Sequence, residues 1–87
     1  MINVRLARGL RPLGGHELCR CVREAADVRG GLQHVYAEIG GEGAELVLFL
    51  TAASQTAAHA AARRIMTRSL SAEPLRGWAL RPAVVDF

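Results

Sequence analysis

The stretch from Arg8 to His16 contains the side chains best suited to hold a ligand. Arg8 and Arg11 precede Gly14 and Gly15, which stand at the start of a segment with helical periodicity. The first amides of a helix have no partners within it and carry partial positive charge, and no Ser, Thr, Asp or Asn is present to cap them. With two guanidinium groups nearby, these amides would suit a carboxylate or a phosphate. The segment therefore predicts a site for a small anionic metabolite, although a plain glycine-rich loop has the same composition.

His16, Cys19 and Cys21 form a second group of candidate ligands, because imidazole and thiolate groups bind zinc and copper. Residues two apart on a helix point about 200° away from each other, so Cys19 and Cys21 cannot easily share a metal or bond to each other. A closed zinc site needs four ligands at compatible spacing, and this chain has too few. We expect no metal and no other cofactor, with Cys21 as a small core residue. A small metal-binding carrier that uses these three side chains is the alternative.

Two histidines are the candidates for acid–base chemistry. His34 shares a predicted strand face with Tyr36 and Glu38, and His59 lies one helical turn before Arg63. No Ser or Cys nucleophile stands beside either histidine. Histidine side chains on exposed faces are commonly just solvated. We therefore expect no enzymatic activity and assign no catalytic residue.

Hydrophobic periodicity predicts the elements that would position these side chains. Strands are expected over 2–7, 34–39, 45–51 and 77–85, and helices over 16–29 and 54–70. The strand over 45–51 is apolar without alternation, which is typical of a central strand covered on both faces. Ser54 or Thr51 would cap the second helix, and Gly30 would end the first in a left-handed conformation. Pro82 suits an edge strand.

This order of elements predicts a single α+β domain over residues 1–87 with a ferredoxin-like β-α-β-β-α-β arrangement. Right-handed crossovers would give an antiparallel sheet of strand order 4-1-3-2 with both helices on one face. The strand residues expected to face the helices are Ile2, Val4, Leu6, Val35, Ala37, Ile39, Leu46, Leu48, Leu50, Trp78 and Leu80. Residues 82–87 would form a tail or extend the last strand.

The other face of the predicted sheet has an apolar centre. Val47 and Phe49 lie there with Tyr36, while Arg5 and Arg81 should be neighbours at one side. An apolar centre is seldom left in water, so we expect a second copy of the chain or a partner protein to cover it. A tail folded over the face is the alternative.

A single-stranded RNA is another alternative for this face, because aromatic side chains on such a sheet can stack on bases. The strand over 45–50 lacks the basic, glycine and aromatic signature of RNA-recognition modules, and the net charge of +3 is modest. Glu38, Glu42 and Glu45 make one end of the sheet acidic, whereas the first three charged residues are arginines and the stretch 63–81 is basic. These features disfavour nucleic acid and favour complementary docking between proteins.

The β-α-β-β-α-β order with Gly14 and Gly15 in the first loop resembles the ACT domains, which are regulatory modules that dimerise and bind amino acids or other small effectors. The resemblance covers nearly the whole chain in topology and implies a homodimeric regulatory module with its ligand at that loop. Cys19 and Cys21 stand where ferredoxin-like heavy-metal-associated domains carry a Cys-x-x-Cys pair, but their spacing is Cys-x-Cys. Acylphosphatases share the fold, yet their anion loop and paired Arg and Asn do not appear here.

The composition indicates the source and the compartment. All 11 basic residues are arginine, and alanine and glycine are abundant, a bias that GC-rich codons would produce, so we expect a bacterial, actinobacterial source. No apolar run approaches the roughly 18 residues of a membrane span, and no apolar stretch follows the first charges. We expect a cytoplasmic protein with reduced thiols and no membrane partner.

Overall fold

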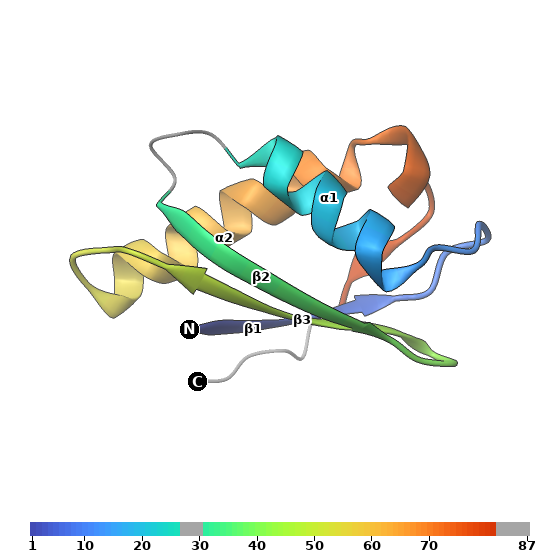
Figure 1. The fold of residues 1–87 in the computed structure, drawn as a ribbon, viewed down its shortest axis with the longest axis horizontal. Helices are drawn as coiled ribbons and strands as arrows, with labels where there is room; N and C mark the ends of the chain where they lie inside the picture. Colours follow the sequence, from blue (N-terminus) through green and yellow to red (C-terminus); the bar gives the residue numbers. More distant parts are fainter. Residues whose placement is uncertain (27–30, 82–87) are drawn as a thin grey trace.

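The computed structural model describes residues 1–26 and 31–81. These residues form a small α+β structure, in which two α-helices lie on one side of a four-stranded antiparallel sheet (Figure 1). The elements follow in the order β1 (Ile2–Ala7), α1 (Gly15–Ala25), β2 (Leu32–Ile39), β3 (Gly43–Leu50), α2 (Gln55–Leu70), the short 3₁₀ helix η2 (Glu73–Leu75) and β4 (Ala79–Leu80).

The strands lie in the order β2-β3-β1-β4, which is 4-1-3-2 when counted from the β4 edge. The central strand β1 pairs with β3 along its whole length, from Ile2 opposite Leu48 to Ala7 opposite Gly43. On its other side β3 pairs with β2, with one irregularity in register near the start of β2. All pairs are antiparallel, so residues that lie opposite each other present their side chains on the same face.

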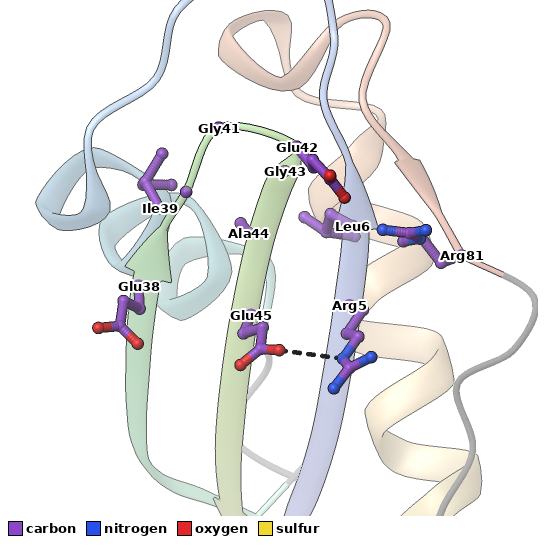
Figure 2. Close-up of a pocket in the computed structure, with 11 residues that line it drawn as sticks. Arg5, Leu6, Glu38, Ile39, Gly41, Glu42, Gly43, Ala44, Glu45 and Arg81 are labelled. Atoms are coloured by element: carbon purple, nitrogen blue, oxygen red, sulfur yellow. Dashed lines mark ion pairs between the residues drawn. The ribbon is translucent and has the colours of Figure 1, made fainter.

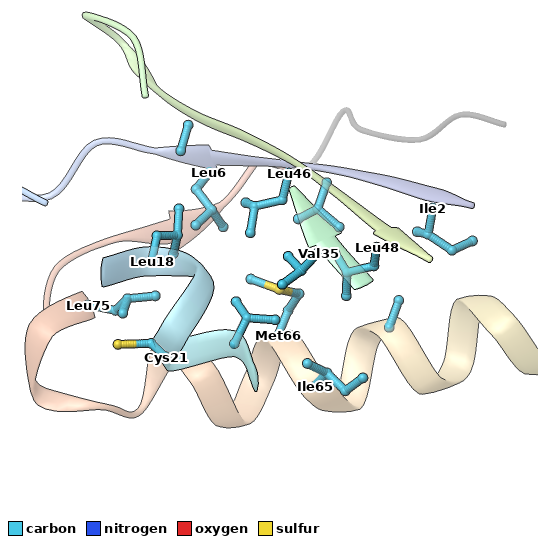
Figure 3. Close-up of a cluster of buried hydrophobic side chains, with 14 of the residues drawn as sticks. Ile2, Leu6, Leu18, Cys21, Val35, Leu46, Leu48, Ile65, Met66 and Leu75 are labelled. Carbon is cyan, nitrogen blue, oxygen red and sulfur yellow. The ribbon is translucent and has the colours of Figure 1, made fainter. Parts of the chain in front are cut away.

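The core lies between the sheet and the two helices (Figure 3). Every second residue of β1 is buried opposite a buried residue of β3. The helices add Leu18, Cys21, Val22, Ala58, Ala62, Ile65 and Met66. Of the strand residues expected to face the helices, all except Leu80 are buried or half-buried, so the predicted strand faces are confirmed.

The helix starts agree with the sequence, but α1 ends early. Ser54 caps α2 by accepting a hydrogen bond from the Ala57 amide at 3.1 Å. α1 stops at Ala25, not at residue 29, because the backbone of Ala26 is extended, with ψ of 130°. The predicted cap Gly30 lies outside the described residues, and Gly31 before β2 is left-handed, with φ of 73°. Neither helix within the described ranges is long and apolar enough to cross a bilayer.

The last strand differs most from the prediction. β4 comprises Ala79 and Leu80 and starts later than predicted, because residues 76–77 form a turn in which Gly77 has a φ of 87°. The rest of the predicted strand, from residue 82 on, lies outside the described residues. Trp78 is buried as predicted, but it precedes the strand. Leu80 lies opposite Leu6 and so on the helix side, yet it is 39% exposed. The edge position of β4 explains this, because one flank of an edge strand has no neighbouring strand to cover it.

Gly43 marks a close approach between β1 and the β2–β3 hairpin. Its φ is +155°, which L side chains rarely adopt, and a Cβ atom there would collide with the Leu6 carbonyl oxygen. We expect Gly43→Ala to lower the free energy of unfolding by about 2–3 kcal/mol. Urea denaturation followed by circular dichroism measures this.

The matched control is Gly41→Ala in the same hairpin, where a Cβ atom would meet open space. This control should change the free energy of unfolding by less than about 0.5 kcal/mol. Equal stability of the two variants would show that the approach to Leu6 does not constrain the hairpin.

Candidate functional site

We call the side of the sheet away from the helices the open face. Pairing and burial place on it the side chains of Asn3, Arg5, His34, Tyr36, Glu38, Glu45, Val47, Phe49, Ala79 and Arg81. The five predicted interaction residues Arg5, Tyr36, Val47, Phe49 and Arg81 all lie on this face. The sheet thus brings them together from β1, β2, β3 and the residue that follows β4.

Tyr36, Val47 and Phe49 form the apolar centre of the open face. Tyr36 is 56% exposed, Phe49 is 38% exposed and Val47 is half-buried. Tyr36 lies directly opposite Val47, and the ring centroid of Phe49 is 5.9 Å from that of His34. β3 was predicted to be covered on both faces. Among the described residues, only its helix side is covered, and its other side is exposed at Phe49.

Four charged side chains cross the open face in one line, which we call the charged row. Glu38 lies opposite Glu45, and Glu45 lies opposite Arg5. Arg81 lies beside Arg5, because its amide donates a hydrogen bond to the Arg5 carbonyl at 3.0 Å. From the β2 edge to the β4 edge, the charged row therefore consists of two acidic residues followed by two basic ones.

One ion pair lies within the charged row. The Nε atom of Arg5 is 3.0 Å from Oε2 of Glu45 (Figure 2), and both side chains are 61% exposed. An ion pair this exposed contributes no more than about 1 kcal/mol. Glu38 and Arg81, at the two ends of the row, have no ion-pair partner among residues 1–26 and 31–81.

The charged row borders an open hollow of about 490 Å³ at the hairpin end of the sheet (Figure 2). The rest of its lining comes from Leu6 and from residues 39–44. The Glu42 carboxylate and the Arg81 guanidinium point toward one another over the end of β1 in Figure 2. The hollow thus presents both signs of charge, and none of the predicted loop residues lines it.

Sequence reasoning selected Arg5 and Arg81 for this face but did not select the glutamates as site residues. The signal was visible, because residues 31–50 contain acidic residues and no basic one. Only strand pairing shows that Glu38 and Glu45 extend the same row as the two arginines.

The loop between β1 and α1 joins distant parts of the fold. The Nη1 atom of Arg8 donates to the Gly40 carbonyl at 3.0 Å, and the Arg8 amide donates to the Glu42 carbonyl at 3.2 Å. The Arg11 carbonyl accepts a hydrogen bond from Nε1 of Trp78 at 3.1 Å. One of the two guanidinium groups predicted to bind an anion is thus already bound to the hairpin.

The other predicted loop residues lie around the start of α1. Gly14 is its N-cap and has no side chain to cap the helix, whereas Gly15 begins the helix beside the backbone of β2. His16 and Arg11 are exposed, and the Arg11 guanidinium makes no hydrogen bond or ion pair within the described ranges. A small-anion site here stays a prediction that would depend on Arg11 and the first amides of α1.

The candidate metal ligands point to different surroundings. Cys21 is buried as part of the hydrophobic core (Figure 3), as predicted. Cys19 is half-buried with its Sγ atom 3.8 Å from the Val35 carbonyl oxygen, and His16 is exposed. Within the part of the chain that the structure describes, no three His, Cys, Asp or Glu side chains are placed to hold a metal ion.

Comparison with known proteins adds no assignment for these surfaces. No protein-family model, curated protein or solved structure matches the chain. Its function must therefore be inferred from its own residues, among which those of the open face form the most extensive candidate site.

Trp78 holds the loop before α1 against the chain that follows η2. It is 4% exposed and donates its indole N–H to the Arg11 carbonyl. Trp78→Phe keeps an aromatic ring but removes the donor, so we expect a loss of about 1–3 kcal/mol in the free energy of unfolding. Urea denaturation followed by circular dichroism measures it.

Tyr36→Phe is the reference for this substitution, because it removes a hydroxyl from a ring that is 56% exposed. Tyr36→Phe should lower the free energy of unfolding by less than about 0.5 kcal/mol. If the Trp78 and Tyr36 variants are equally stable, the indole hydrogen bond does not hold the loop.

Burial raises the pKa of the Cys21 thiol, and the carboxylates of Glu17 and Glu24 raise it further. The folded protein therefore keeps this proton at pH values where the unfolded chain has lost it. The contribution of Cys21 to stability should be fully present below the pKa of an unfolded cysteine, about 8.5, and should be lost as the pH rises toward the higher folded-state pKa.

Urea denaturation between about pH 7 and pH 10 measures this slope. Cys21→Ala should remove the decline in unfolding free energy at alkaline pH, whereas Cys19→Ala should leave it in place. A decline that persists in Cys21→Ala would mean that other groups cause it.

Proposed function

We propose that this chain is a non-catalytic regulatory or accessory module that self-associates through its open face. The observation that carries the proposal is the exposed apolar centre formed by Tyr36, Val47 and Phe49, on a sheet whose other face is buried under both helices. Large apolar groups gathered on an exposed surface commonly mark an interaction site, because covering them removes apolar area from water.

The charged row favours a second copy of the chain over an unrelated partner. Its two glutamates and two arginines balance, so it suits neither a strongly acidic nor a strongly basic surface. A second copy carries both signs in equal number. Most soluble oligomers are symmetric assemblies of identical chains, and charge complementarity selects among the ways in which two surfaces can meet.

A single-stranded RNA is a poorer occupant of this face. Glu38 and Glu45 lie beside the aromatic centre, and Arg5 is already paired with Glu45. RNA binding depends on basic side chains that neutralise phosphates, and these carboxylates would repel them.

We also propose that the fold is ferredoxin-like. The order of strands and helices, the antiparallel sheet and the placement of both helices on one side support a ferredoxin-like fold. Self-association agrees with the resemblance to ACT domains. A small anionic effector at the first loop would have to use Arg11, since Arg8 is bound to Gly40.

Sedimentation equilibrium of the purified chain tests the proposal. We expect a concentration-dependent dimer, and we expect Phe49→Thr to raise its dissociation constant about tenfold or more, because a truncated aromatic anchor loses most of its buried contacts. Leu10→Thr is the matched control, since Leu10 is fully exposed in the first loop and not on the open face. The dimer dissociation constant of the Leu10→Thr variant should equal that of the unaltered chain.

Two results would contradict the proposal. One is a chain that stays monomeric up to about millimolar concentration. The other is salt-sensitive retention on immobilised single-stranded RNA that Phe49→Thr abolishes, which would assign the open face to nucleic acid.

A further inference from the structure

We infer that two copies of this chain pack face to face about a two-fold axis that runs parallel to the strands, between β1 and β3. This inference rests on the proposed self-association and specifies its geometry. In this arrangement Glu38 of each copy faces Arg81 of the other, and Glu45 of each faces Arg5 of the other.

The order of charges across the sheet specifies the axis. From β2 to β4 the charged row reads Glu38, Glu45, Arg5, Arg81. A half-turn about an axis parallel to the strands keeps the row at the same height along the strands but reverses its order. The acidic half of one row then lies over the basic half of the other, and the same contact occurs twice because the axis is two-fold.

An axis that runs across the strands gives no such match. If it passes through the charged row, it places Glu38 over Glu38 and Arg81 over Arg81. If it passes through the apolar centre, it carries the two rows to opposite ends of the interface, away from each other. Like charges in contact disfavour an interface, so an axis through the charged row gives a repulsive contact. An axis through the apolar centre leaves the charged row of each copy without contact to that of the other.

The spacing of packed sheets suits the proposed contacts. Two sheets that pack face to face lie about 10 Å apart, a gap that an extended arginine and a glutamate can bridge together. Within the described residues, Glu38 and Arg81 have no ion-pair partner, so the second copy would supply one for each. Arg5 and Glu45, already 3.0 Å apart within one chain, would join a network of alternating charges with the same pair of the other copy.

Charge reversal at the two ends of the charged row tests this geometry. Glu38→Arg places arginine over arginine, and Arg81→Glu places glutamate over glutamate. Each single variant should raise the dimer dissociation constant about tenfold or more, as measured by sedimentation equilibrium. The double variant Glu38→Arg/Arg81→Glu restores opposite charges at both contacts and should return the constant to within about threefold of the unaltered chain.

A mixture of the two single variants should also associate. One chain then carries arginine at positions 38 and 81 and the other carries glutamate at both, so each of the two contacts joins opposite charges. The mixture should form a mixed dimer at concentrations where each variant alone is monomeric.

Glu24→Arg and Arg64→Glu are the matched controls. Both side chains are exposed on the helices, and the substitutions change the net charge by the same amounts as those in the charged row. Neither should change the dissociation constant by more than about threefold. Circular dichroism of every variant verifies that the fold is retained.

Three outcomes would overturn the geometry. If the dimer is weakened by Phe49→Thr but not by the charge reversals, the open face is the interface and the axis is wrong, so the proposed function stands. If the double variant is as weak as the single ones, Glu38 and Arg81 do not face each other. If the unaltered chain never dimerises, both the proposed function and the geometry fail. If such a chain dimerises only after it is shortened to end at Arg81, the open face is instead covered by the last residues of the same chain.

Discussion

Successive side chains of a β-strand point to opposite faces of its sheet, and this alternation connects the core of the protein with its open face. Leu46 and Leu48 of β3 are buried under the helices, so Val47 and Phe49 have to face the other way. β3 is flanked by β1 and β2, which hold it in the middle of the sheet. Apolar residues at these two positions consequently meet water unless something covers the open face. The apolar surface on which the proposed self-association rests thus follows from the way the core is built.

The same alternation links the charged row to the core. The row comes from segments far apart in the sequence, and it is straight because neighbouring strands are aligned at one level. A slip of one residue in β1 would turn Arg5 inward and Leu6 outward, at the cost of a buried leucine and a buried charge. The contacts of Leu6 with the core therefore hold Arg5 on the open face. At Gly43 the hairpin approaches Leu6 so closely that a side chain would not fit.

The first loop shows how residues suited to a ligand can serve the fold. Arg8 binds the carbonyl of Gly40 with its side chain and that of Glu42 with its amide, and the Arg11 carbonyl receives the indole N–H of Trp78. These hydrogen bonds connect the loop with the β2–β3 hairpin and with the chain after η2. Since the hairpin lines the hollow beside the charged row, the loop helps to shape the open face.

By itself the sequence determined the features that depend on neighbouring residues. Alternation predicted β1 and β2 with their buried sides, and an unbroken apolar run predicted β3. The hydroxyl of Ser54 predicted the start of α2, because strand faces and helix caps arise from residues a few positions apart. Only the tertiary structure decided the partner of Arg8, the late start of β4 with Leu80 exposed, and the alignment of Glu38 with Arg81. These features depend on contacts between distant segments, which form when the whole core packs and leave no local pattern in the chain.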